Sequence, residues 1–309
     1  MTEYSTHPST WLTAFPKSGS TWLRFLVHHL LYGPSTCSSE VEADLPSIHE
    51  KQPLSPLRRR KGRLILTHKT WEAQRALQIP TAGFVQLIRH PVDVVLSDMR
   101  YFLLTQLDSY LRSDGLDSRT MQEHAKDLAG IFLTHLLQNK DTPKQRQLGF
   151  GSWSENVESW LAVQQDYPHV VVRYEDLRSN PAAQLGRVAL FLGLNPDREA
   201  LDNATSACSI KAMRQLQERE IRNRQPGRFY QPRHQVAYEA GLRFVNEGHV
   251  GSAAAFGPEI LDRLQEIYGE TMTKLGYGIK DSQCTVDPLD FFDAVTPILE
   301  THWSGQQAS

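Results

Sequence analysis

The sequence predicts an α/β protein, and three stretches carry that prediction. An apolar stretch that ends at Phe15 is followed by a small, hydroxyl-rich turn and then by apolar residues at helical spacing as far as Leu31. The same order of strand and helix returns over residues 83–102. Residues 170–174 are rich in β-branched side chains, which is typical of a central buried strand. Strands and helices therefore alternate along the chain.

The length of the chain is sufficient for one large domain. With 309 residues the protein can form one large α/β domain or two modest ones, and either can bury a sizeable core; we favour one. We expect a single domain over residues 1–280, followed by an extension over residues 281–309 whose role the sequence does not indicate.

The composition excludes several classes of protein. A formal net charge of −2 indicates no large basic face, so nucleic acid is not an expected partner. No stretch reaches the ~18 consecutive apolar residues of a membrane span, and residues 1–10 lack the apolar core of a signal peptide. The cysteines Cys37, Cys208 and Cys284 are odd in number, far apart and without metal-ligand spacing. We therefore expect a cytoplasmic protein with reduced thiols, no membrane partner and no metal.

The first turn has the features of an anion-binding loop. It reads Pro16-Lys17-Ser18-Gly19-Ser20-Thr21-Trp22 and lies between the first strand and its helix. Such a loop aims backbone N–H groups and the positive end of the helix dipole at one point, which suits a phosphate or sulfate group. Lys17 would add a mobile positive charge, and Ser20 and Thr21 would add hydroxyl donors. The loop differs from the Walker A pattern because Lys17 precedes the glycine.

This loop resembles the 5′-phosphosulfate loop of the sulfotransferase family, whose members use 3′-phosphoadenosine 5′-phosphosulfate (PAPS) as donor. An ordinary strand-to-helix turn with a solvated lysine is the alternative. The resemblance extends over roughly residues 11–277 and implies a three-layer α/β fold of the P-loop-like sulfotransferase type, with a central parallel sheet flanked by helices. It implies that Lys17 is catalytic. It also assigns the donor's 5′ end to Ser18, Gly19, Ser20, Thr21 and Trp22.

A short strand over residues 64–67 ends at His68. In open α/β sheets, ligands gather at the carboxyl ends of strands. Taken alone, a histidine such as His68 is more often a surface histidine, or one with its hydrogen bonds satisfied, than a catalyst. The stretch resembles the family segment that ends in Lys-Thr-His, which implies that His68 is the general base. Leu66 stands where many members carry a second lysine, so that contact is missing or is supplied by Lys69.

The next strand, over residues 83–88, leads into a second phosphate-type motif. Residues 89–97 read Arg-His-Pro-Val-Asp-Val-Val-Leu-Ser and match the family's Arg-x-Pro-x-Asp-x-x-x-Ser run, which binds the 3′-phosphate of the nucleotide. Arg89 offers a planar fork of donors to phosphate oxygens, and Ser97 adds a hydroxyl. The alternative is that Arg89 caps a helix or pairs with Asp93.

Three later segments carry the remaining candidate residues. Ser152 and Glu155 predict a capping box, and the Gly-Ser-Trp start of that helix resembles the family helix that borders the acceptor pocket. Trp153 would then touch the acceptor, with a buried structural tryptophan as the alternative. Residues 174–177 match a stretch whose tyrosine, Tyr174, lies near the adenine. Residues 208–213 resemble the segment that packs under the adenine, which implies that Ser209 and Ile210 bind the nucleotide.

The family's last nucleotide segment shows the clearest departure. It is commonly Arg-Lys-Gly-x-x-Gly-Asp-Trp, but here Asn246 and Glu247 precede Gly248. A glutamate beside a 3′-phosphate would repel it by ~1 kcal/mol when solvated. Glu247 should therefore point away, or another cation must take over the clamp. The candidates for that clamp are Arg228, Arg233 and Arg243.

Together these features predict a PAPS-dependent sulfotransferase. The acceptor would be a hydroxyl or an amine or guanidine nitrogen of a small molecule, such as a specialised metabolite. The dimer pattern of many cytosolic members is missing, so we expect a monomer or weak homodimer. Two alternatives remain open. An ATP-dependent small-molecule kinase would need a Walker lysine and an acidic metal site, and neither is arranged around the first loop. A catalytically inactive nucleotide-binding module is supported by Glu247 and Leu66.

Overall fold

The computed structural model describes residues 8–49, 63–114, 121–248 and 250–279. The expected extension over residues 281–309 and Cys284 lie outside these ranges. The chain divides into two compact units, one formed by residues 1–89 and 143–229 and the other by residues 90–142 and 230–309. The expectation of a single domain over residues 1–280 stays a prediction.

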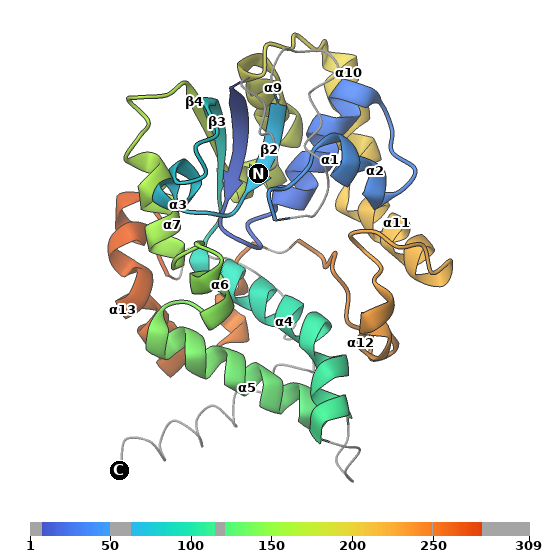
Figure 1. The fold of residues 1–309 in the computed structure, drawn as a ribbon, viewed down its shortest axis with the longest axis vertical. Helices are drawn as coiled ribbons and strands as arrows, with labels where there is room; N and C mark the ends of the chain where they lie inside the picture. Colours follow the sequence, from blue (N-terminus) through green and yellow to red (C-terminus); the bar gives the residue numbers. More distant parts are fainter. Residues whose placement is uncertain (1–7, 50–62, 115–120, 249, 280–309) are drawn as a thin grey trace. The chain divides into compact units, whose positions relative to one another are not determined.

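The first unit contains a parallel four-stranded sheet in the order β2-β1-β3-β4. The strands are β1 (Ser9–Ala14), β2 (Arg63–Thr67), β3 (Thr81–Ile88) and β4 (His169–Arg173). The helices of this unit are α1 (Ser20–Tyr32), α2 (Ser38–Asp44), α3 (Trp71–Arg75), α6 (Pro143–Gln147), α7 (Trp153–Leu161), α8 (Tyr174–Ser179), α9 (Pro181–Phe191), α10 (Arg198–Ala207) and α11 (Ile210–Arg222). Figure 1 shows α3 and α7 on one face of the sheet and α1 and α9 on the other. The predicted three-layer α/β architecture is therefore confirmed.

The core beneath α3 and α7 follows from the alternation of side chains along the strands. Trp11 of β1 is in register with Ile65 of β2 and with Phe84 of β3, and all three are fully buried. Trp71 of α3 and Trp160 of α7 cover this row and meet edge to face, with ring centroids 5.2 Å apart. Burying each of these large side chains contributes roughly 2–3 kcal/mol, so this layer holds the middle of β1, β2 and β3 against α3 and α7.

The prediction of a central buried strand over residues 170–174 is wrong. Within the described sheet, β4 lies at the edge next to β3, and Val172 is its one fully buried residue. Tyr174 belongs to α8 instead. The β-branched side chains indicate strand propensity, but they do not reveal how many neighbours a strand has.

The second unit is organised around α4 (Pro91–Asp114). Its other elements are α5 (Met121–Asn139), η1 (Pro232–His234), α12 (Gln235–Glu239), η2 (Ser252–Ala255) and α13 (Pro258–Lys274). Two buried aspartates of α4 bind backbone N–H groups: Asp93 accepts from Gly251 (3.0 Å) and Ser252 (2.7 Å), and Asp108 accepts from residues 236 and 237. These bonds attach the later loops of the unit to α4. None of the helices in the described ranges has the length and apolar character to cross a membrane.

Candidate functional site

The loop between β1 and α1 has an unusual backbone. Lys17 has a φ of 68° and Gly19 a φ of 100°, so both lie in the left-handed region. A lysine there is uncommon, and such backbone strain clusters at functional sites. The Ser18 N–H donates to the Phe15 carbonyl (3.2 Å), which closes the turn. No side chain caps the start of α1, so its first N–H groups face the loop and suit an anion.

Ser18 supports an anion in this loop. Its side chain is only 1% exposed, and its hydroxyl has no hydrogen-bond partner in the described structure. A buried hydroxyl without a partner is costly, which favours a ligand with acceptor oxygens at this position. Ser20 is also buried, whereas Lys17 and Thr21 are half-buried. The chemistry of the loop therefore fits the phosphosulfate end of PAPS.

Arg89 is held against this loop. Its Nη1 donates to the Lys17 carbonyl (3.2 Å), and its guanidinium lies 4.2 Å from the centre of the Tyr174 ring. The indole of Trp153 donates to the Arg89 carbonyl (3.1 Å). The Tyr174 ring itself packs directly on Gly19. Arg89 therefore lies beside the 5′ loop, and its contact with a 3′-phosphate stays a prediction.

The predicted adenine segment lies next to the same loop. The indole of Trp22 donates to the Cys208 carbonyl (2.7 Å), immediately before Ser209 and Ile210. The Ser209 hydroxyl accepts from the Ala212 N–H and caps α11, and Ile210 is half-buried at the first position of that helix. The structure thus brings the two segments together. Contacts of these residues with an adenine stay predictions.

Trp153 begins α7, and the predicted capping box is confirmed. The Ser152 side chain accepts from the Glu155 N–H, and the Glu155 carboxylate accepts from the Ser152 N–H (2.7 Å). Trp153 is 1% exposed, and its indole N–H donates to the Arg89 carbonyl. These contacts favour the structural alternative, and a contact with an acceptor stays a prediction.

His68 follows β2 and is held from three sides. Its Nδ1 lies 2.7 Å from the Ala14 carbonyl, its backbone N–H donates to His49 Nε2 (2.9 Å), and its carbonyl accepts from Asn156 Nδ2 (2.8 Å). A carbonyl oxygen can only accept, so Nδ1 carries the proton and Nε2 keeps its lone pair. His68 can therefore receive a proton at Nε2.

The electrostatic surroundings keep His68 neutral. The pKa of His68 is lowered to about 4: burial is the largest cause, the hydrogen bond to the Ala14 carbonyl opposes it, and the positive charges of Arg228, Arg24 and Lys17 act in the same direction as burial. A neutral imidazole is the form that a general base requires. The same cations favour an anionic ligand beside His68, and such a ligand would raise the pKa of His68 and strengthen it as a base.

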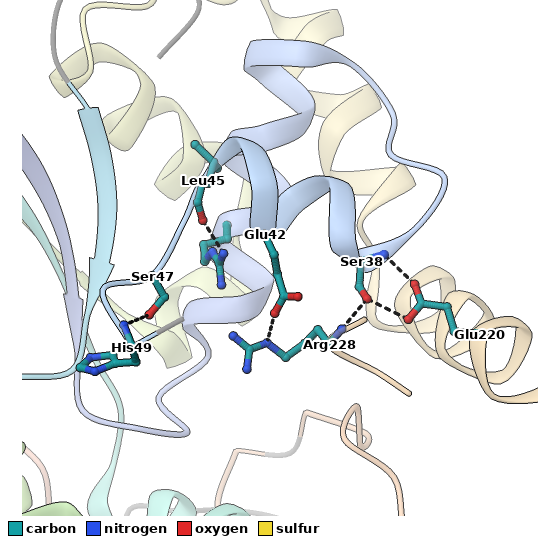
Figure 2. Close-up of polar contacts among 8 residues, drawn as sticks. Ser38, Glu42, Leu45, Ser47, His49, Glu220 and Arg228 are labelled. Carbon is teal, nitrogen blue, oxygen red and sulfur yellow. Dashed lines mark hydrogen bonds and ion pairs between the residues drawn. The ribbon is translucent and has the colours of Figure 1, made fainter. Parts of the chain in front are cut away.

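Figure 2 shows the polar contacts that anchor Arg228. Its Nε pairs with a Glu42 oxygen (2.8 Å), and its backbone N–H donates to the Ser38 hydroxyl (2.8 Å). The Glu220 carboxylate accepts from both the hydroxyl and the N–H of Ser38. Glu220 is completely buried, so this network firmly attaches the end of the first unit to α2.

The other residues predicted to bind the donor are described by their own positions, and their contacts with it are not tested by the structure. Ser97 is half-buried on α4 and Gly248 has a φ of 64°, both in the second unit. Glu247 is exposed there. Lys69 donates from Nζ to the Leu148 carbonyl (2.6 Å), so its use on the donor stays a prediction. The prediction that one of three arginines replaces the missing cations also stays a prediction; the candidates are Arg228, Arg233 and Arg243.

Sequence reasoning missed three residues around His68. His49 and Phe150 surround its ring, and Asn156 fixes its carbonyl. His49 lies in the segment between Pro46 and Pro53. No local pattern indicates that this segment pairs with β2. Asn156 lies one turn into the predicted helix, and its position after the capping box was the available signal.

The two site histidines make stability depend on pH. The pKa values of His49 and His68 are lowered to about 3 and about 4, whereas an unfolded histidine titrates near 6.5. Below that value the unfolded chain binds protons that the folded chain does not, so the free energy of unfolding falls as pH falls towards 4. We expect the thermal midpoint to drop between pH 6.5 and pH 4 less steeply in His49→Gln than in wild type. His169→Gln, at an exposed position, is the control; an unchanged slope in His49→Gln would contradict the prediction.

Sequence comparisons identify similar proteins over most of the chain. Residues 7–276 match a family model described as a sulfotransferase domain. Mouse sulfotransferase 1B1 is 25% identical over 216 residues, which cover 66% of this chain and 64% of that protein. Mouse sulfotransferase 2A6 is 23% identical over 218 residues, which cover 66% of each. The matched part therefore spans slightly less than two thirds of these relatives.

Solved structures show the same fold. Mouse sulfotransferase SULT7A1 complexed with PAP has a TM-score of 0.56 at 17% identity, with 88% of this chain and 87% of that chain covered. Retinol dehydratase in a complex with retinol and PAP has a TM-score of 0.56 at 13% identity, with 92% and 85% covered.

Proposed function

This chain belongs to the sulfotransferase family, and we propose that it transfers a sulfuryl group from PAPS to a small-molecule acceptor. One observation carries the proposal. The anion loop, with its buried Ser18 hydroxyl, follows β1, and the neutral His68 follows β2. Because β1 and β2 are parallel neighbours, both lie at the carboxyl ends of the strands. The PAP bound in the similar solved structures supports it, because PAP is what PAPS becomes when its sulfuryl group leaves.

His68 would act as the general base. Its Nε2 takes the proton of the acceptor hydroxyl while the acceptor oxygen forms a bond to sulfur and the bond from sulfur to the phosphate oxygen breaks. The Ala14 carbonyl holds the proton on Nδ1, so Nε2 is the nitrogen that accepts the acceptor's proton. The imidazolium formed is stabilised by the negative charge that develops on the departing phosphate.

The loop residues would supply binding and charge stabilisation. Lys17 balances the charge on the oxygen that leaves sulfur, and Ser18 and the first N–H groups of α1 hold the 5′ end of the donor. In a transfer of this kind, positioning and electrostatics account for most of the catalysis. Arg89 keeps the loop in shape through the Lys17 carbonyl.

The surroundings of His68 favour a hydroxyl acceptor over a nitrogen acceptor. Arg228, Arg24 and Lys17 all lower the pKa of His68 through their positive charge. The same charges would disfavour an ammonium or guanidinium group close to His68. We therefore rank a neutral alcohol or phenol above an amine or guanidine as acceptor. Retinol, in the dehydratase complex, is an example of a hydroxyl-bearing ligand in a similar fold.

Replacing Lys17 by Ala tests the role of the loop. We expect turnover of PAPS to fall about a hundredfold or more, because the departing oxygen loses its positive partner. Binding of PAP should weaken much less, since the backbone N–H groups remain. Turnover is measured by the mass shift of a library of alcohols and phenols, and binding by isothermal titration. Lys144→Ala, at an exposed lysine of α6, is the control.

Three outcomes separate the possible functions. A wild-type protein that binds PAP and sulfates at least one acceptor supports the proposal. A protein that binds PAP but modifies none of the library under any condition favours the inactive nucleotide-binding module. A protein that prefers ATP with magnesium over PAP favours the kinase, and either of the last two results would remove the proposed transfer. Unchanged turnover in Lys17→Ala would remove the role of that lysine.

A further inference from the structure

The short segment of residues 46–48 runs along the outer edge of β2. The Leu66 N–H donates to the Pro46 carbonyl (2.9 Å), and the Ile48 N–H donates to the Leu66 carbonyl (3.1 Å). Ser47 and Leu66 form an isolated parallel bridge. In a parallel pair the register advances equally on both strands, so the residues two positions beyond this bridge are His49 and His68. The sheet edge therefore places these two histidines side by side.

The two rings are stacked. Their centroids lie 5.3 Å apart and their planes differ by 8°. Phe150 meets both rings edge-on, at 4.9 Å from His49 and 5.7 Å from His68. These contacts confine the His68 ring from two directions. Its remaining freedom is rotation in its own plane, which the bond from Nδ1 to the Ala14 carbonyl restricts.

His49 also replaces a missing bond of the sheet. β2 ends at Thr67, and the next backbone N–H, that of His68, donates to His49 Nε2 (2.9 Å). This bond requires an unprotonated Nε2. Burial is the main cause that lowers the pKa of His49 to about 3; the repulsion that would arise if His49 and His68 were both protonated and the positive charges of Lys69 and Arg228 add to it, so His49 is neutral. The Ser47 hydroxyl accepts from the His49 N–H (3.2 Å) and fixes the turn that carries the ring.

We propose that His49 is a positioning residue for sulfuryl transfer, which holds the backbone and the ring of His68 so that Nε2 of His68 faces the acceptor. This rests on the proposed function. His49 acts in two ways: its Nε2 accepts the His68 N–H, and its ring stacks on the His68 ring. A misplacement of a catalytic group by about 1 Å can lower the rate about a hundredfold, so either contact can matter for turnover.

A matched pair of variants separates the two contacts. His49→Phe keeps an aromatic ring but has no acceptor, and His49→Gln keeps an acceptor oxygen at similar reach but has no ring. We expect kcat to fall about tenfold to a hundredfold in His49→Phe, with KM for PAPS unchanged, and to recover in large part in His49→Gln. His169→Phe, at an exposed histidine, controls for the substitution itself.

A second readout is independent of activity. Hydrogen exchange of the His68 amide should become fast in His49→Phe and stay slow in His49→Gln, because only the second variant offers the N–H a partner. The thermal midpoint reports whether each variant folds. If both variants keep wild-type kcat, or if His68 exchange is equally slow in both, the positioning role is wrong. If wild type transfers no sulfuryl group, the proposed function fails, and the exchange result still decides whether His49 holds His68.

Discussion

His68→Ala is expected to abolish most turnover while leaving the donor bound. Removing the imidazole deletes the group that receives the acceptor proton, and general-base catalysis is typically worth about 10²–10⁴-fold in rate. Donor binding should be little affected, because the hydrogen bonds of His68 are with Ala14, His49 and Asn156, and its ring packs against His49 and Phe150. The measurements are kcat in a PAPS assay and the Kd for PAP by titration.

The result is interpreted against two controls. His169→Ala changes an exposed histidine and should behave as wild type in both measurements. His68→Gln restores a polar side chain of similar reach without a titratable nitrogen, so it separates loss of the base from loss of packing against Phe150. A turnover in His68→Ala close to that of wild type would exclude the base role. Equal losses of kcat and PAP affinity would indicate a collapsed site instead.

The parts of the site that could be predicted from the sequence are those that depend on local order. The loop from Lys17 to Trp22 was identifiable because an apolar strand, a small polar turn and a helical pattern follow one another without interruption. The capping box at Ser152 was identifiable for the same reason, since both of its partners lie within one turn. Such features need no knowledge of the tertiary structure.

The parts that could not be predicted depend on which segments meet in space. His49 is 19 residues before His68, and its role requires the pairing of residues 46–48 with the edge of β2. The β-branched residues within 170–174 correctly indicated a strand, but they wrongly indicated a central one. β4 lies at the edge because of the order of the strands in the sheet, which local sequence does not reveal. The contacts of the Tyr174 ring with Gly19 and Arg89 also depend on which segments meet in space, and a contact of this ring with an adenine stays a prediction.

The second large effect is expected from a substitution that disturbs the contact between Gly19 and Tyr174. A Cβ at position 19 would lie 2.5 Å from Cδ2 and 2.7 Å from Cε2 of the Tyr174 ring, and Gly19 has a φ of +100°. Gly19→Ala therefore combines backbone strain with a steric clash, and we expect the free energy of unfolding to fall by about 3 kcal/mol. The tyrosine ring cannot move without disturbing the guanidinium of Arg89, which lies 4.2 Å from its centre. PAP affinity should consequently fall as well.

Gly33→Ala separates strain from clash. Gly33 ends α1 with a φ of +89°, but an added Cβ would meet nothing within 4 Å. The ψ of Gly33, −169°, lies in a region that almost only glycine adopts, so this variant should lose about 1–3 kcal/mol of stability to backbone strain and keep its affinity for PAP, because it carries the strain without a clash. The clash can be relieved by a second change: Gly19→Ala in a Tyr174→Ala background should cost less than in wild type, in unfolding by denaturant. If Gly19→Ala costs the same stability with and without Tyr174 and binds PAP normally, then the Tyr174 ring yields easily, and the anion loop does not depend on that ring for its shape.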